Sequence, residues 1–114
     1  MAKSRDQIIG TIAFRNEGDG CLSAKYQHGD DINGPFPEGC KLISGSNPHD
    51  PFIGRFRTTW LEATSNEVGI LSIERDRRNT SQYRLRWTDL GNTVTYFEGT
   101  GMLFNGNLVC AYWD

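Results

Sequence analysis

Residues 82–113 read QYRLRWTDLGNTVTYFEGTGMLFNGNLVCAYW, and this stretch decides the fold that the sequence predicts. Aromatic and aliphatic side chains alternate with polar ones in three short runs, at residues 82–88, 93–104 and 108–113. A period of two is the pattern of a β-strand that buries one face. Asn-Gly at residues 105–106 lies between the last two runs and is a strong signal for a tight hairpin turn. This stretch therefore predicts antiparallel strands joined by short turns.

The same alternation continues towards the N-terminus, in runs separated by clusters of glycine, asparagine, aspartate and proline, while helical periodicity is nearly absent. The predicted strands cover residues 7–15, 21–28, 40–44, 52–62, 69–75, 82–88, 93–104 and 108–113. Short connections favour antiparallel neighbours in up-and-down order, and eight such strands can close a barrel that has no exposed edge. We therefore predict an all-β fold, a single eight-stranded antiparallel up-and-down β-barrel domain over residues 1–114. A β-sandwich is the alternative.

Composition and charge narrow the class of protein further. The chain has 114 residues, which is the usual length of one domain, and 37% of them are hydrophobic, which excludes a disordered chain. Twelve basic and 14 acidic residues give a net charge of −2, so no broad basic footprint points to nucleic acid as a partner. No apolar stretch is long enough for a signal peptide or a membrane span, so we expect no membrane partner.

The cysteines and histidines predict neither disulfides nor a metal site. The three cysteines, Cys21, Cys40 and Cys110, are odd in number and widely spaced, so they do not form a disulfide framework. They include no CxxC pair that could bind zinc. The two histidines, His28 and His49, have no carboxylate at a metal-binding spacing. No phosphate-binding loop, serine elbow or HExxH motif is present. We therefore expect a reduced cytoplasmic protein with no cofactor and no metal.

The end of the chain carries a Gly-x-Gly element at residues 99–101, a tight glycine turn at residues 105–107, and a last strand that reaches an aromatic residue at Tyr112. In these features residues 82–112 resemble the closing strands of calycin-type barrels, the group of lipocalins, fatty-acid-binding proteins and avidin-like proteins. The resemblance implies a ligand-binding barrel. It transfers no site residues, because residues 10–12 read Gly-Thr-Ile in place of the Gly-x-Trp of lipocalins and no set matches the biotin contacts of avidins.

Aromatic side chains dominate the faces that we predict to point inward. An eight-stranded barrel is either filled by its own side chains or holds one small ligand. Because the polar tips of buried tyrosine and tryptophan need partners, several of them around one cavity would suit a partly apolar ligand. A solid aromatic core is the alternative. The inward set is Phe14, Tyr26, Phe56, Trp60, Tyr83, Trp87, Tyr96 and Tyr112.

Two ionisable side chains complete the candidate site. Glu98 shares the alternation of Val94 and Tyr96, so it faces the cavity if they do. Burial there would raise its pKa and suit it as a general acid or base, whereas a bend in the strand would turn it to solvent. His28 ends its strand on the face of Tyr26, where it would either bind a ligand at the barrel mouth or be solvated.

Two further features lie outside the predicted cavity. Alternating arginines would form a basic stripe for an acidic partner if their strands are close, and otherwise a solvated face. These arginines are Arg55, Arg57, Arg84 and Arg86. The irregular segment at residues 29–39 carries Phe36 between two prolines, and it would either cap the barrel mouth or anchor on the outer wall.

Three functions fit these patterns. The first is a small-molecule-binding barrel whose tyrosine hydroxyls, with Glu98 or His28, orient a partly apolar ligand. The second is a small-barrel enzyme of the isomerase or cyclase kind, with Glu98 or a tyrosine as acid or base. The third is an interaction module with a solid barrel. The sequence leaves the choice between them open, and it leaves a homo-oligomer open as well.

Overall fold

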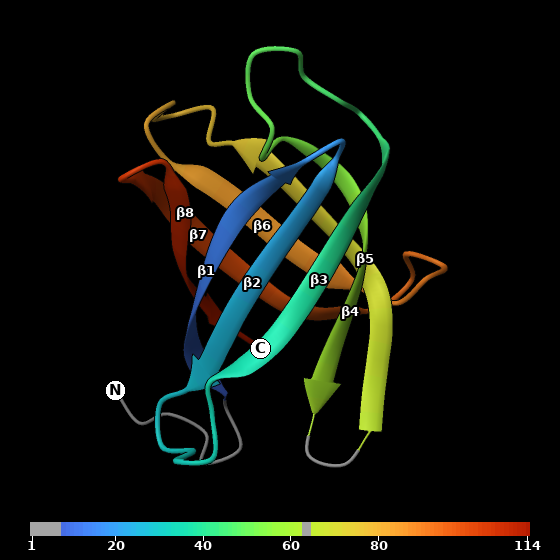
Figure 1. Cartoon of the computed structure of the whole chain (residues 1–114), viewed down its shortest axis with the longest axis vertical. Coiled ribbons are helices and arrows are strands. Elements are labelled where there is room, and N and C mark those ends of the chain that lie inside the picture. Colours follow the sequence, from blue (N-terminus) through green and yellow to red (C-terminus); the bar gives the residue numbers. More distant parts are fainter. Residues whose placement is uncertain (1–7, 63–64) are drawn as a thin grey trace.

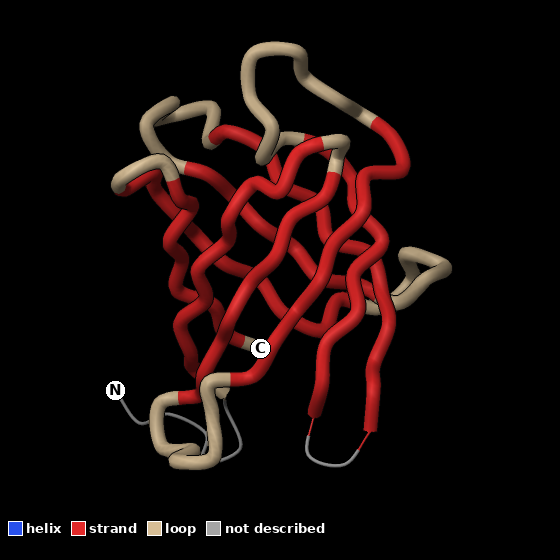
Figure 2. Tube along the Cα trace, viewed as in Figure 1, coloured by secondary structure: helices blue, strands red, loops and turns tan. Residues whose placement is uncertain are grey.

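The computed structural model describes residues 8–62 and 65–114, which form strands, turns and loops and no helix (Figures 1 and 2). This confirms the all-β prediction. The strands are β1 (Ile9–Gly18), β2 (Cys21–His28), β3 (Phe36–Ser44), β4 (Gly54–Glu62), β5 (Ser65–Arg75), β6 (Tyr83–Thr88), β7 (Thr95–Phe104) and β8 (Asn107–Trp113).

The eight strands form one closed barrel in chain order, and each strand is antiparallel to both neighbours. The closure is the ladder between β1 and β8, which runs from the pair Ile9 and Trp113 to the pair Phe14 and Leu108. Figure 1 shows these two strands side by side. The up-and-down barrel is therefore confirmed, and the β-sandwich alternative is wrong.

Two strands begin four residues earlier than the sequence predicts. β3 begins at Phe36 instead of residue 40, because Pro37 and Gly39 lie on its outer, exposed face and do not interrupt its inner face. β5 begins at Ser65 instead of residue 69, because Glu62 and Ser65 still pair across the β4–β5 connection. Residues 1–7, on which the absence of a signal peptide and the start of the first predicted strand were argued, lie outside the described residues.

The two ends of the barrel differ. One end of the barrel, which we call the open end, carries the β2–β3 and β6–β7 loops, the starts of β1 and β5, and the ends of β4 and β8 (Figure 1). At the opposite, closed end the long β3–β4 loop brings Asp50 and Phe52 into the barrel, where they are 5% and 4% exposed. Asp50 Oδ2 accepts hydrogen bonds from the hydroxyl of Tyr83 at 2.5 Å and from Arg75 Nη2 at 2.7 Å. These contacts hold the loop in place.

Large side chains fill the closed half of the interior. Phe14, Phe56, Leu71 and Leu108 are at most 1% exposed. They come from four different strands and occupy buried positions on the inner faces of these strands. The barrel is therefore solid at this end, and any ligand site lies elsewhere in it.

Two inner positions of β7 are glycines because atoms of the neighbouring strands occupy the space that a side chain would need. A Cβ at Gly99 would lie 2.8 Å from the Ala111 carbonyl oxygen and 3.3 Å from the Trp87 ring. A Cβ at Gly101 would lie 2.6 Å from Cys110 Sγ. The Gly-x-Gly element thus makes room for the neighbouring side chains.

Gly99→Ala is expected to destabilise the protein by about 2 kcal/mol, because the added methyl group overpacks the interior against backbone. Urea unfolding of the variant measures this loss. Thr100→Ala, on the exposed outer face of the same strand, is the matched control and should stay within about 0.5 kcal/mol of the parent. Equal losses in the two variants would contradict this account of the glycine.

Within the described residues, no helix is long and apolar enough to span a membrane.

Candidate functional site

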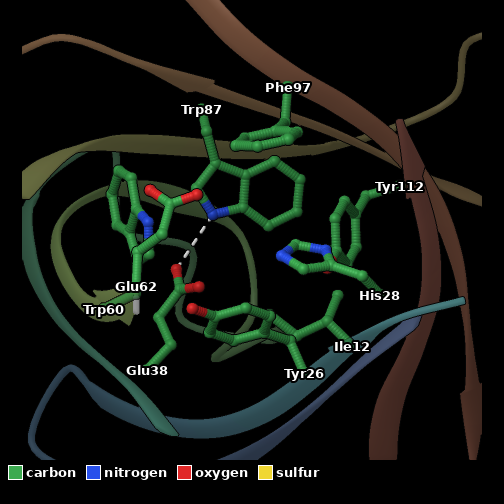
Figure 3. A pocket seen from close by; sticks show the side chains of 9 residues that line it. All are labelled: Ile12, Tyr26, His28, Glu38, Trp60, Glu62, Trp87, Phe97 and Tyr112. Atoms are coloured by element: carbon green, nitrogen blue, oxygen red, sulfur yellow. Dashed lines mark hydrogen bonds between the residues drawn. The ribbon is translucent and has the colours of Figure 1, made fainter. Parts of the chain in front are cut away.

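A cavity lies inside the open end of the barrel (Figure 3). The free space between its lining atoms is about 320 Å³ including the opening to solvent, yet the centre of a water-sized sphere can move through only about 20 Å³ of it. That volume is enough for about one water molecule. The lining residues are Ile12, Tyr26, His28, Glu38, Trp60, Glu62, Trp87, Phe97 and Tyr112.

Aromatic rings form most of the cavity wall. The Tyr112 ring centroid lies 5.5 Å from that of Phe97, 5.9 Å from that of Trp87 and 6.3 Å from that of Tyr26. The rings meet at angles between 58° and 85°, so edges and faces alternate around the wall. Such contacts are favourable and hold the rings in fixed positions. The cavity is therefore a preorganised, mostly apolar space.

Glu38 is the charged centre of this space. It occupies an inner position of β3 and is 6% exposed. Its Oε2 atom accepts hydrogen bonds from Trp87 Nε1 at 2.9 Å and from the hydroxyl of Thr58, with the Cys40 thiol at 3.9 Å as a weaker donor. In the part of the chain that the structure describes, no donor reaches Oε1. This oxygen is not among fully buried atoms without a partner, so it remains partly accessible. One carboxylate oxygen thus stays available to a molecule in the cavity.

Burial raises the pKa of Glu38 from 4.5 to about 7, because the charged form loses its hydration in the barrel. The hydrogen bonds from Thr58, Trp87 and Cys40 act in the opposite direction, since they favour the carboxylate. Near neutral pH, Glu38 therefore exists both as an acid and as a carboxylate. A small change in its surroundings, such as a bound ligand, can shift it towards either form.

The tyrosines of the cavity remain hydrogen-bond donors at physiological pH. Burial raises the pKa of Tyr26 to about 12, and the negative charges of Glu62 and Glu38 add to the effect. Burial likewise raises the pKa of Tyr112. The Tyr26 hydroxyl donates to the Leu61 carbonyl, and the Tyr112 hydroxyl lies 2.8 Å from His28 Nδ1. Both hydroxyls therefore have partners at the rim or beside the cavity.

The structure brings together part of the set that the sequence suggested. Tyr26, His28, Trp60, Trp87 and Tyr112 all line the cavity. They come from strands β2, β4, β6 and β8, whose inner faces meet at the open end.

Four aromatic residues of that set lie outside the cavity. Phe14 is buried in the closed half of the barrel. Phe56 is fully buried in the closed half, and Tyr83 bonds to Asp50 at the closed end. Tyr96 lies at the rim, is 40% exposed, and places its ring 6.3 Å from that of Trp60. The expectation that Phe56 and Tyr83 face a shared cavity is therefore wrong, because alternation identifies the inner face of a strand but not the height along the barrel.

Of the two positions that the sequence left open for Glu98, the structure has the one that faces solvent. Glu98 is exposed on the outer face of β7, opposite Arg86 of β6. The inner positions are Phe97, Gly99 and Gly101, since the small residues are needed where neighbouring side chains press inward. Glu98 therefore provides no buried acid or base.

Sequence reasoning missed Glu38, Glu62 and Phe97. Glu38 was assigned to a loop, because Pro37 and Gly39 on either side of it are unusual within strands. The signal that could have found it is the alternation of Phe36, Glu38, Cys40 and Leu42, which continues the inner face of β3. Phe36 itself packs against Tyr26, with 5.6 Å between ring centroids.

Comparisons with known proteins identify no relative of this chain. No protein-family model, no curated protein and no solved structure matches the chain. Among residues 8–62 and 65–114, no group of three or more His, Cys, Asp or Glu side chains is placed to hold a metal ion. The site is therefore interpreted from its own side chains.

The arginine stripe on the outer wall is real but mixed in charge. Arg55 and Arg86 lie on either side of Ser72, because β5 runs between β4 and β6. Acidic residues stand opposite two of the arginines on neighbouring strands: Glu74 faces Arg84, and Glu98 faces Arg86. Opposite charges on adjacent strands stabilise a sheet face. This arrangement agrees with a solvated outer face.

Proposed function

We propose that this protein is a small-molecule-binding barrel whose partly apolar ligand enters the open end. One observation carries the proposal. A carboxyl group that is 6% exposed lies among aromatic rings in a cavity open to solvent, with one oxygen that no described residue bonds. Burying a carboxylate costs folding free energy. Proteins tend to keep such groups at functional sites, so Glu38 marks a candidate binding site.

The size of the cavity indicates how the ligand is held. Only a group about as large as a water molecule fits beside Glu38 without rearrangement. The rest of the ligand would lie against the rings at the rim, where Trp60 and Tyr96 meet edge to face. We therefore infer a ligand with a small polar head and an apolar body.

Two further parts of the proposal concern kinship and location. The closed eight-stranded antiparallel barrel is compatible with a calycin-type protein, which supports the resemblance of the C-terminal strands.

Cys21, Cys40 and Cys110 are all unpaired, and two of them are buried. Free thiols support a reducing, cytoplasmic location.

Native mass spectrometry of the freshly purified protein tests the binding function. We expect a retained small molecule on the parent protein and none on Ile12→Phe, in which the larger side chain fills the cavity. Thr11→Phe adds the same ring on the exposed outer face of β1 and is the matched control that should keep the molecule. Two results together would overturn the proposal: the parent protein retains no small molecule, and no small apolar compound perturbs its Trp87 indole signal.

One observation favours a second candidate, an acid–base enzyme of the isomerase or cyclase kind. Burial brings the pKa of Glu38 to about 7, where a carboxyl group can both give and take a proton. Turnover that is lost in Glu38→Gln and that titrates near neutral pH would support the enzyme. Retained ligand affinity without any turnover would favour the binding protein.

A further inference from the structure

Charge is distributed unevenly between the two ends of the barrel. Among the described residues of the open end, at positions 8–10, 27–38, 59–62, 65–68, 87–97 and 112–114, every Asp, Glu, Lys or Arg side chain is a carboxylate. Lys25, which pairs with Pro37, is the basic residue beside this region, and it is exposed on the outer face of β2. We call six of these carboxylates, all except the buried Glu38, the acidic rim. They are Asp30, Asp31, Glu62, Glu67, Asp89 and Asp114.

The basic residues lie mostly towards the other end. Arg77 and Arg78 belong to the β5–β6 loop, and Arg55 lies near the start of β4, beside the β3–β4 loop. The net charge of −2 is therefore distributed unevenly, with an excess of carboxylates at the open end. The field of such a protein draws cations towards its open end and repels anions from it.

The interior of the cavity favours cations over anions, as the acidic rim does. Glu38 Oε1 faces the free space without a described donor, whereas Oε2 already accepts bonds from Trp87 and Thr58. The walls are mostly aromatic rings, whose faces attract cations. A second anion beside Glu38 would meet repulsion with little water to screen it.

We propose that the cavity takes the primary ammonium head of an alkylamine, with the –NH₃⁺ group donating to Glu38 Oε1 and the alkyl chain lying against Trp60 and Tyr96. This inference rests on the proposed binding function and names its ligand class. An –NH₃⁺ group is compact and its size matches the space for about one water molecule. A quaternary ammonium group is too bulky for the same position.

The proposal predicts a definite pH dependence. The ionisable groups around Glu38 are Tyr26 and His28 of β2, Cys40 of β3, Glu62 of β4, and Cys110 and Tyr112 of β8. A cation binds the ionised form of Glu38, so its affinity is full above pH 7 and falls about tenfold per unit below the pKa of that carboxyl. Binding near neutral pH therefore releases a proton.

Three probes with the same hexyl chain test the head group: n-hexylamine, 1-hexanol and hexanoate. Binding is followed by the indole N–H signals of Trp87, which donates to Glu38, and of Trp60 at the rim. At pH 8 we expect hexylamine to bind at least about tenfold more tightly than hexanol, with hexanoate weakest. A charge-assisted bond to a buried partner justifies this ratio.

Three variants locate the contact. Glu38→Gln keeps the shape and is expected to weaken hexylamine about 10- to 100-fold while hexanol is unaffected. Glu62→Gln, at the rim, should weaken it less, and Glu98→Gln, on the outer face, should leave it unchanged. The unchanged binding of hexanol to Glu38→Gln also shows that this variant is folded.

The outcomes separate this inference from the proposed function. Hexanol or hexanoate binding as tightly as hexylamine would overturn the ammonium head and keep the binding barrel. Equal binding of tetramethylammonium and methylammonium would overturn the primary head. A retained ligand in native mass spectrometry without any effect of hexylamine would also overturn the ammonium class. If there is neither a retained ligand nor any probe effect on Trp87, both proposals are wrong.

Discussion

Glu38→Gln is expected to be more stable than the parent protein at pH 8 and about equally stable at pH 5. In the parent, the folded pKa of about 7 lies above the unfolded value of 4.5, so the folded protein binds the proton more tightly. The stability from this group is full below pH 4.5 and is lost as the pH rises through 7. At about 1.4 kcal/mol per pKa unit, the loss is roughly 3 kcal/mol.

Urea unfolding of both proteins between pH 5 and pH 8 measures this effect. Other groups that titrate in this range are common to the two proteins, so the difference between their curves isolates Glu38. Glutamine can still accept the bonds from Trp87 and Thr58 through its carbonyl oxygen. Parallel curves over the whole range would show that Glu38 is not desolvated in the folded protein.

Asp50→Ala is expected to cost about 3 kcal/mol of unfolding free energy, because it removes the acceptor of a buried network. Asp50 accepts bonds from the Tyr83 hydroxyl at 2.5 Å, Arg75 Nη2 at 2.7 Å and the Phe52 amide at 3.0 Å. Tyr83 is 1% exposed, so its hydroxyl would find no water in exchange. The β3–β4 loop would lose its attachment to the barrel at the same time.

Chemical denaturation of a small set of variants checks this prediction. Asp30→Ala, at an exposed position of the β2–β3 loop, is the control and should change stability by less than about 0.5 kcal/mol. Tyr83→Phe should cost about 1 kcal/mol, and the double variant should lose less than the sum of the two single losses. Strict additivity would mean that Asp50 and Tyr83 do not share a bond.

The fold could be predicted from the sequence because its signals are local and agree with one another. Period-two alternation identifies the inner face of most strands, and the turn at residues 105–106 fixes the last hairpin. The start of β3 could not be found this way. Pro37 and Gly39 are poor strand residues, and only pairing with β2 and β4 makes that segment a strand.

The candidate site could be predicted only in part, because alternation says which side chains face inward but not where along the barrel they lie. Tyr83 and Trp87 share an inner face of β6, yet at about 3.3 Å per residue they lie roughly 13 Å apart. Tyr83 therefore bonds to Asp50 at the closed end, whereas Trp87 bonds to Glu38 in the cavity. Height along the barrel follows from the register of all eight strands, which no single segment contains.

The choice between Phe97 and Glu98 shows a second limit. Tyr96, Phe97 and Glu98 follow one another, so the pattern allows either face of β7 to point inward. The packing of Trp87 and Cys110 decides it, since their atoms lie where side chains at Gly99 and Gly101 would begin. A contact between strands that are distant in the sequence thus sets the orientation of β7.

The ladder between β1 and β8 joins residues 9–14 to residues 108–113 and so has a consequence for how the chain acquires its structure. Hairpins such as β1–β2 need only neighbouring residues, and they can form while the chain is still being synthesised. The ladder cannot form until residues 107–113 have left the ribosome. Since contacts between distant residues slow folding, this last pairing should limit the rate, and until then the unpaired edge of β1 is open to other chains.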